Sequence, residues 1–406
     1  MKLAEKYWVL ADQVVVSGSA FATNLLLARA LGIAQYGIFS GLVLVQLLVL
    51  SLLQASITGL APVLLAHIGI GEKRSYTGGL FWFHQAILTL LFVAGILFFL
   101  FADTMWAVGR NIGIAAVVGA CLYFMQDYLR RWLLATQQQP KAFAIDVLTN
   151  VVQLLALAVL FFVYHLDLLI ALWVVALTYI PSVALGVWWL KPGVPIAKDI
   201  RSVALLHARD GKWMLSSALL QWTAGNFYVM AAGWWLGAAA LGALRLGQYI
   251  FGLLNVLLQA FETYILPKAA HLHQEPAALV RFLRKQFLQL SVLLIPVLIL
   301  LAVFGKPLLH MAGGDTYTSY SYVMIGLAIL YVFILFGYPV RIALRVQLLN
   351  KFYFYGYVLA TIFSVATAYF MIHFFQLWGA LAGMLLAQCM LLVYWLYILY
   401  NKNIRV

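Results

Sequence analysis

Two arginines lie within long apolar stretches of the sequence, where a positive charge is unexpected. Arg29 lies near the end of the first stretch, and Arg245 lies near the start of a later one. A guanidinium group binds two phosphate oxygens at once, so both side chains are candidates for binding an anionic ligand. Gly247, Gln248 and Tyr249 give Arg245 polar surroundings that favour this interpretation. The alternative is that both side chains extend to a polar surface and bind nothing.

A second group of arginines lies at the ends of apolar stretches. Arg131, Arg341 and Arg345 could form an anion-receiving site, since Arg131 and Arg341 occupy equivalent positions in two related parts of the chain. They are explained equally well as positive residues that fix the orientation of a membrane protein. Asp127 lies one helical turn before Arg130 and Arg131, which predicts an ion pair within the helix.

Uncharged polar residues also interrupt the apolar stretches. Asn24 and Asn226 carry amides, which supply both donors and acceptors for hydrogen bonds. They are candidates for binding a hydroxyl-bearing ligand, and the alternative is hydrogen bonding between helices. For Gln54 and Gln259 we favour that structural role, because their positions are related by the repeat described below.

Three residues are candidates for binding and releasing a proton or another cation, and so for coupling an ion to the protein's function. His84 titrates near neutral pH, and Asp12 and Glu262 lie near the ends of apolar stretches. A single histidine in such a stretch is otherwise a packing residue. No pair of carboxylates deep in these stretches is evident from the sequence, so the identity of the ion stays open.

Motifs for catalysis and for cofactors are missing from the sequence. It has no GxxxxGK[ST] motif for ATP, no HExxH and no CxxC. Cys121 and Cys389 both fall in apolar stretches, where a thiol behaves as a small apolar side chain. We therefore expect no enzyme activity, no cofactor and no metal site.

The elements that carry these residues are predicted to be transmembrane helices. Of the 406 residues, 66% are hydrophobic and 9% are charged, too few for the surface of a soluble protein. The hydrophobic residues form blocks of about 20, the length of a helix that crosses a bilayer. The sequence therefore predicts an all-α membrane protein with about twelve transmembrane helices.

The distribution of positive charge predicts how these helices are oriented. We expect spans at 9–32, 38–62, 79–101, 112–136, 144–164, 168–190, 213–236, 243–266, 288–310, 321–343, 353–373 and 378–400. If the N-terminus is cytoplasmic, 21 of the 25 Lys and Arg residues fall on the cytoplasmic side, as the positive-inside rule requires. Both termini are then cytoplasmic, and the net charge of +13 reflects this topology rather than nucleic-acid binding.

The spans divide six and six, and the two sets resemble each other. We expect an N-terminal bundle over 1–190, a cytoplasmic linker over 191–212 and a C-terminal bundle over 213–406. With a shift of 205 residues the sequence matches itself at Leu31, Gly32, Ala34, Gly37, Gln54, Ala55, Thr58 and Pro62, which correspond to Leu236, Gly237, Ala239, Gly242, Gln259, Ala260, Thr263 and Pro267. An even number of spans in each half gives both the same orientation. Two parallel six-helix repeats around a central cavity are a recurrent plan of transporters.

Several segments resemble one family of membrane transporters. They are LLLARALGIAQYGIFSGLVLVQLL with Pro62, the turn LGAAALG at 236–242, Phe304-Gly305, and HFFQLWGALAGMLLAQ at 373–388. Together they resemble the Wzx-type polysaccharide-flippase branch of the multidrug/oligosaccharidyl-lipid/polysaccharide exporter superfamily. The related lipid II flippases usually carry two further spans, which this chain lacks.

The resemblance implies a function and a location. The implied function is to move undecaprenyl-diphosphate-linked oligosaccharide, an O-antigen or exopolysaccharide repeat unit, across the bacterial inner membrane by alternating access. The implied partners are this lipid-linked substrate, membrane lipids, and the polymerase and glycosyltransferases of the same pathway. One alternative is a cation-coupled drug antiporter of the same superfamily, which would need acidic residues in its cavity. Another is a membrane component of glycan assembly that transports nothing.

Overall fold

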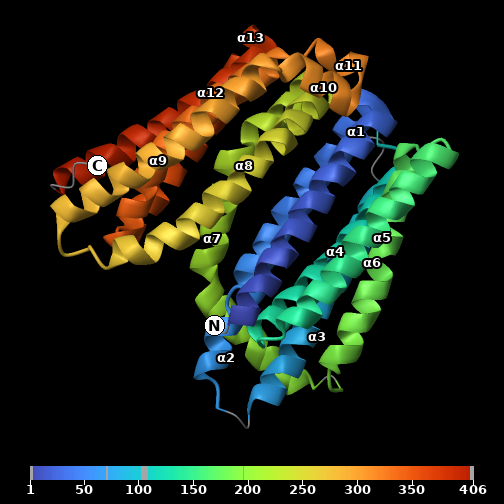
Figure 1. The fold of residues 1–406 in the computed structure, drawn as a ribbon. Coiled ribbons are helices and arrows are strands. Elements are labelled where there is room, and N and C mark those ends of the chain that lie inside the picture. Colours follow the sequence, from blue (N-terminus) through green and yellow to red (C-terminus); the bar gives the residue numbers. More distant parts are fainter. Residues whose placement is uncertain (1–2, 70–71, 102–107, 195, 403–406) are drawn as a thin grey trace. The chain divides into compact units, whose positions relative to one another are not determined.

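The protein is built from α-helices (Figure 1). The computed structural model describes residues 3–69, 72–101, 108–194 and 196–402, and these ranges contain no β-strand. In chain order the elements are α1 (Leu3–Leu53), the π-helical turn η1 (Gln54–Thr58), α2 (Ala61–His67), α3 (Lys73–Phe101), α4 (Arg110–Ala135), α5 (Gln139–Val163), α6 (Leu168–Leu190), α7 (Ala197–Leu236), α8 (Ala238–Ala270), α9 (Pro276–Val303), α10 (Gly305–Gly313), α11 (Asp315–Thr318), α12 (Tyr322–Val346) and α13 (Asn350–Asn401).

Most of the long helices are suited to a membrane. In the described part of the chain, nine helices are long and apolar enough to cross a bilayer. Two of them, Ala11–Leu65 and Asn350–Asn401, have 55 and 52 residues, and each covers two of the expected spans. α7 contains the expected span 213–236, although it is not among the nine. The predicted all-α membrane architecture is therefore confirmed.

The two longest helices are each broken by a single residue. Gly32 interrupts α1 with φ 70° and ψ 172°, and Gln376 interrupts α13 with φ 54° and ψ −137°. Glycine adopts a positive φ without strain because it has no Cβ, whereas glutamine at this φ and ψ is strained. Both pairs of spans are therefore joined by a break of one residue, where the sequence suggested short loops.

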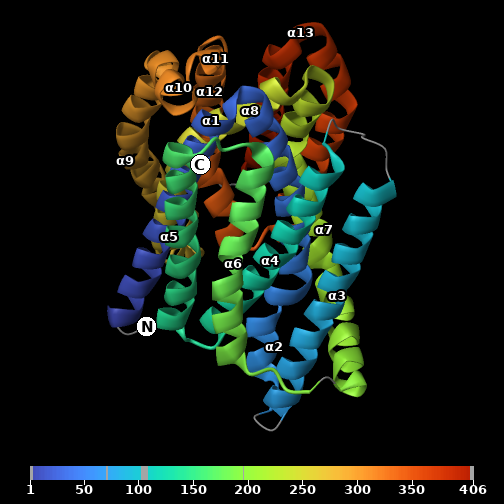
Figure 2. The same ribbon diagram turned by 90° about the vertical axis from the view of Figure 1, so that its right-hand side faces the viewer.

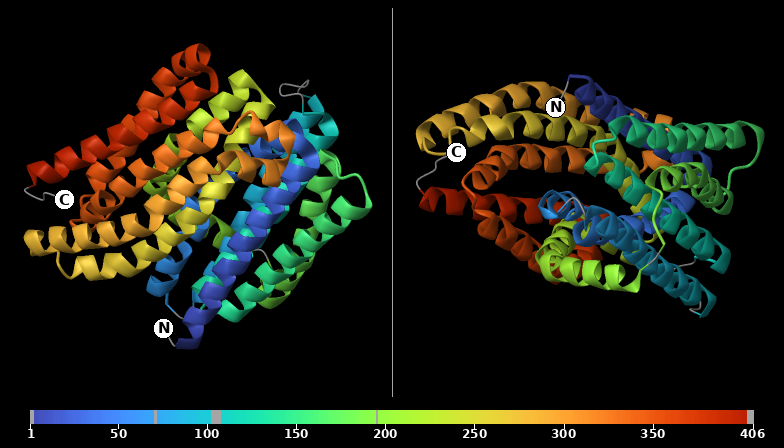
Figure 3. Two further views of the ribbon diagram at one scale, coloured as in Figure 1. Left: turned by 45° about the horizontal axis from the view of Figure 1, so that its top comes forward. Right: turned by 90° about the horizontal axis from the view of Figure 1, so that it is seen from below.

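Two polar stretches expected as loops are mostly helical. α8 continues to Ala270, and α9 begins at Pro276, well before the span start expected at 288. Proline suits the first turn of a helix, where no backbone donor is needed. In the same way, α7 begins at Ala197 inside the expected linker 191–212. Figure 3 shows α8 and α9 side by side, joined by a short turn.

The chain divides into two compact units. Unit 1 comprises Met1–Leu31 and Leu42–Leu219, and unit 2 comprises Gly32–Gly41 and Leu220–Val406. The division falls inside α7, and a short part of α1 belongs to unit 2. The bundles expected at 1–190 and 213–406 describe the sequence repeat, whereas the units describe which residues pack together.

In unit 1, α4 packs along α3, α5 and α6 (Figure 2). Its C-terminal half is buried through residues such as Tyr128 and Leu129. Gly186 of α6 allows this close packing, because an added Cβ would lie 2.8 Å from a methyl carbon of Leu129. The residues of α4 that follow Phe124 are therefore held firmly among three neighbouring helices.

In unit 2, α12 packs along α8, α9 and α13, and residues 32–41 cross the start of α8. Glycines make this crossing close. A Cβ on Gly37 would collide with the carbonyl oxygen of Ala238, and one on Gly242 would collide with that of Ile33. The shift of 205 residues relates Ile33 to Ala238 and Gly37 to Gly242, so each contact repeats the other. This reciprocal contact supports the internal repeat.

Candidate functional site

Unit 1 contains a buried cluster of charged side chains from three helices, which we call the unit 1 ionic cluster. It consists of Asp12 of α1, Gln126 and Arg130 of α4, and Asp146 of α5. Nη2 of Arg130 lies 2.6 Å from Asp12, and its Nε donates to Asp146. The amide of Gln126 donates to the other oxygen of Asp146 over 2.7 Å. Four polar side chains are thus joined among apolar helices.

This cluster brings together two carboxylates from different helices. Asp12 and Asp146, each near the end of an expected span, meet at one guanidinium group. With Arg130 charged and both aspartates ionised, the cluster carries a net charge of −1. Oδ1 of Asp12 is buried and has no hydrogen-bond partner among the described residues. The cluster is therefore able to accept one more positive charge, such as a proton.

A second ion pair lies one residue further along α4. Arg131 Nε lies 2.9 Å from Asp127 of the same helix, which confirms the predicted pair within the helix. Arg130, which was also expected to be near Asp127, points to the unit 1 ionic cluster instead. Gln54 in η1 donates to Asp127 over 3.2 Å, so its interhelical role is confirmed. Its repeat counterpart Gln259 is exposed.

Unit 2 has its own ionic cluster, formed by Glu262 of α8 and by Tyr338, Arg341 and Arg345 of α12. Nη2 of Arg341 lies 2.7 Å from Glu262, and Arg345 donates to the second carboxylate oxygen. The Tyr338 hydroxyl lies 3.1 Å from Glu262, and the Arg341 guanidinium lies 4.7 Å from the Tyr338 ring centre. One carboxylate is shared by two arginines, so this cluster carries a net charge of +1.

Arg245 lies apart from this cluster, near the start of α8. It is 8% exposed. Its Nη1 donates to Gln248 over 3.0 Å, and its Nη2 donates to the Tyr249 hydroxyl over 3.2 Å. Its guanidinium lies 4.8 Å from the Tyr249 ring centre, and Tyr36 is close enough to interact with it electrostatically. No carboxylate pairs with Arg245 in the described part of the chain.

The other residues singled out from the sequence lie in separate places. In unit 1, Asn24 is buried and donates to Ala20 O over 2.8 Å, whereas Arg29 is exposed. His84 is buried and stacks on Tyr128 with ring centres 4.4 Å apart. In unit 2, Asn226 donates to the carbonyl oxygen of Trp222 over 3.0 Å.

The structure groups these candidates into clusters within each unit. It joins Glu262, expected to couple an ion, with Arg341 and Arg345, expected to bind substrate. It joins Asp12 with two residues that were not singled out as site residues, Arg130 and Asp146. Asp146 carried a usable signal, because a carboxylate inside an expected span is costly without a partner. Tyr338 carried no such signal, since tyrosines are frequent throughout the chain.

Comparison with known proteins identifies the class and then the family. The chain shares its fold with solved structures of membrane transporters. One of them is "Lipid II flippase MurJ, inward closed conformation", which matches with a TM-score of 0.74 and 10% sequence identity over 98% of this chain and 88% of that one. It also matches an inward-facing multidrug resistance MATE family transporter of the MOP superfamily (TM-score 0.64, 13% identity, 98% and 94% of the chains). A eukaryotic MATE transporter matches with a TM-score of 0.59 and 15% identity over 98% and 97% of the chains.

The family follows from the sequence match. Residues 26–322 match the family described as "Polysaccharide biosynthesis protein", and the chain belongs to that family. No curated protein matches the sequence. The expected resemblance to the polysaccharide branch of the superfamily is thereby confirmed.

Proposed function

We propose that this protein is a flippase for oligosaccharide linked to undecaprenyl diphosphate, an O-antigen or exopolysaccharide repeat unit, and that it works by alternating access in the bacterial inner membrane. Membership in a polysaccharide biosynthesis family supports the glycan. The fold shared with a lipid II flippase supports a lipid-linked substrate. In this proposal both termini are cytoplasmic, the protein catalyses no reaction, and its partners are the polymerase and glycosyltransferases that make and use the glycan.

The observation that carries this proposal is the charge of Arg245. Arg130, Arg131 and Arg341 each contact a carboxylate of their own unit, so their charges are largely neutralised. Arg245 is buried without a carboxylate among the described residues, and burial of an unpaired charge is expensive. A diphosphate supplies the missing negative charge and accepts bidentate hydrogen bonds from a guanidinium group. Arg245 is therefore the residue that we assign to the diphosphate.

The remaining candidates take supporting roles in this proposal. Arg341 and Arg345 share one carboxylate and keep an excess positive charge for a second phosphate contact. Arg29 supplies further positive charge, and Arg131, whose charge Asp127 balances, offers its remaining N–H groups to phosphate oxygens. Asn24 and Asn226 are assigned to sugar hydroxyls. For ion coupling, the Asp12 carboxylate has a free buried oxygen next to Asp146 and is better placed than Glu262, which two arginines occupy, or His84, which stacks on a tyrosine.

The test is export of the glycan in a strain that lacks this protein but keeps the rest of the pathway. Arg245→Gln and Arg245→Lys are compared with Arg201→Gln, which removes an exposed positive charge from unit 1. We expect Arg245→Gln to stop export and to accumulate lipid-linked oligosaccharide in the membrane, with partial export by Arg245→Lys. Normal export by Arg245→Gln at normal protein levels would overturn the proposal.

The unit 1 ionic cluster favours a second candidate function, a cation-coupled drug antiporter. Two carboxylates at one site are what coupling to a cation requires, and a MATE transporter shares the fold. Cells that express the protein would then survive higher concentrations of cationic dyes and drugs. An Asp146→Asn variant would lose that protection, while glycan export would not depend on the protein at all.

A further inference from the structure

Tyr249 lies one helical turn beyond Arg245 on α8, and the two side chains interact in two ways. Nη2 of Arg245 donates to the Tyr249 hydroxyl over 3.2 Å, and the guanidinium carbon lies 4.8 Å from the centre of the tyrosine ring. Residues four positions apart lie on the same face of a helix. Gly247 lies half a turn away and packs on α12, where a Cβ added to it would come 2.7 Å from a methyl carbon of Leu327. The face of α8 that carries Arg245 and Tyr249 is therefore turned away from α12.

Arg245 and Tyr249 differ in how well a ligand can reach them. Arg245 is 8% exposed, and its Nε is buried without a hydrogen-bond partner among the described residues. Tyr249 and Gln248 are half-buried, and both accept hydrogen bonds from the guanidinium group. A ligand therefore reaches Tyr249 and Gln248 more readily than it reaches Arg245 itself.

The Tyr249 hydroxyl accepts one hydrogen bond and still has its own hydrogen to donate. A phenolic hydroxyl is both a donor and an acceptor, and within the described part of the chain no group accepts the hydrogen of this one. Its oxygen accepts from a cation, which polarises the O–H bond and makes it a stronger donor. Tyr249 thus transmits part of the effect of the buried charge to a more exposed position.

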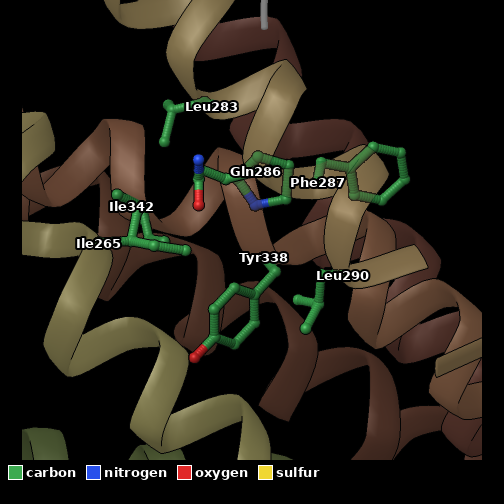
Figure 4. A pocket seen from close by; sticks show the side chains of 8 residues that line it. Ile265, Leu283, Gln286, Phe287, Leu290, Tyr338 and Ile342 are labelled. Carbon is green, nitrogen blue, oxygen red and sulfur yellow. The ribbon is translucent and has the colours of Figure 1, made fainter. Parts of the chain in front are cut away.

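Tyr338 of α12 provides a contrast within the same unit. An arginine also lies beside its ring, since the guanidinium carbon of Arg341 is 4.7 Å from the ring centre. Its hydroxyl, however, already donates to the carbonyl oxygen of Leu258, and Glu262 balances the charge of Arg341. Figure 4 shows Tyr338 in the mainly apolar lining of a gap between α8, α9 and α12. Of these two tyrosines, only Tyr249 combines an unbalanced cation with a hydrogen to donate.

We propose that Tyr249 is a phosphate-binding residue of the anion site at Arg245. Its hydroxyl hydrogen donates directly to a phosphate oxygen, and Gln248 holds the guanidinium group in place with an uncharged acceptor. This inference rests on the proposed function, because it takes the diphosphate of the substrate as the ligand. The arrangement selects for anions, since the hydroxyl hydrogen and the guanidinium N–H groups all donate and none of them binds a cation.

The experiment measures binding of undecaprenyl diphosphate to the purified full-length protein by native mass spectrometry. Undecaprenol, which has the same hydrocarbon chain and no phosphate, is the reference lipid and reports whether each variant keeps its fold. The test variants are Tyr249→Phe, which keeps the ring beside the guanidinium group and removes only the hydroxyl, Arg245→Gln, and the two combined. The matched control is Tyr331→Phe, which removes a hydroxyl that accepts from the Asn255 amide over 2.8 Å in the same unit.

We expect Tyr249→Phe to weaken binding of undecaprenyl diphosphate about tenfold or more, as for a lost hydrogen bond to a charged group, and to leave undecaprenol binding unchanged. In the Arg245→Gln background, adding Tyr249→Phe should change binding much less, because the hydroxyl is no longer polarised. Tyr331→Phe should bind both lipids as the unmodified protein does.

Two results would overturn the role of Tyr249 and leave the proposed function standing, provided that Arg245→Gln loses binding. One is binding of undecaprenyl diphosphate by Tyr249→Phe that is as tight as in the unmodified protein, or tighter, since Tyr249 would then compete with the phosphate. The other is an equal loss in Tyr331→Phe. Full binding by Arg245→Gln would instead overturn the anion site itself and the proposed function with it.

Discussion

Arg130 offers the sharpest test of how charges are accommodated in this protein. Its guanidinium group is the positive partner that binds both Asp12 and Asp146 in the unit 1 ionic cluster. The substitution Arg130→Gln removes this charge and leaves two carboxylates close together among apolar helices. The neighbouring substitution Arg131→Gln is a matched control, because it removes the same group from the next residue of the same helix.

The expected effects differ because Arg130 balances two buried carboxylates, whereas Arg131 balances one. The side chains of Asp12 and Asp146 are 9% and 2% exposed. Two unit charges about 4 Å apart interact by about 4 kcal/mol at an effective dielectric constant of about 20, and losing one partner of a buried pair costs about 3–5 kcal/mol. Arg131 is 36% exposed, and its partner Asp127, which is 11% exposed, also accepts from Gln54, so Arg131→Gln leaves one carboxylate that keeps a hydrogen-bond donor, at a cost of about 1.5–3 kcal/mol. Arg130→Gln should therefore be the more destabilising of the two.

The assay is thermal unfolding of the purified protein in detergent, followed by the fraction that remains monodisperse after heating. Arg130→Gln should lower the midpoint temperature by several degrees, and Arg131→Gln should lower it clearly less. Adding Asp12→Asn to Arg130→Gln should restore part of the loss, because it removes one of the two unpaired charges. Equal destabilisation by the two arginine variants, or no recovery in the double variant, would refute this reasoning.

Three further substitutions test the packing, the helix break and the second cluster. Gly37→Ala places a Cβ against the carbonyl oxygen of Ala238 and should cost about 1–3 kcal/mol by overpacking, measured as a lower unfolding midpoint; an unchanged midpoint would argue against the close crossing. Gln376→Gly should raise the unfolding midpoint, because glycine relieves about 1–3 kcal/mol of backbone strain at φ 54°. A lower midpoint would show that contacts of the Gln376 side chain stabilise the fold by more than this strain destabilises it. Glu262→Gln leaves two arginines without a negative partner and should cost about 1.5–3 kcal/mol, whereas Gln259→Leu, one turn earlier and exposed, should cost little in the same measurement.

The membrane architecture could be predicted from the sequence because hydrophobicity is a property of composition and length. Blocks of about 20 apolar residues have few structural alternatives to transmembrane helices, and the expected spans lie mainly in helices of the structure, with breaks inside 38–62 after Leu53 and inside 288–310 at Phe304. The repeat could be predicted as well, since Gly32 and Gly237 adopt nearly the same backbone angles, with φ 70° and 89°. The exact ends of helices could not, because α9 extends through a polar stretch that composition alone assigns to a loop.

For the candidate functional residues, too, the sequence identified some properties and only the tertiary structure decided the others. Sequence alone determined which charges are unusual, because an arginine or aspartate in an apolar block is costly wherever the block lies. The pairing of those charges was decided only by the tertiary structure, since Asp12, Arg130 and Asp146 come from three separate helices and only packing brings them together. For the same reason, the sequence could not distinguish Arg245 from Arg341. Arg245 is buried without a carboxylate partner among the described residues, whereas Arg341 pairs with Glu262 of α8. Coulomb interactions depend on distances between helices, and those distances are properties of the folded chain.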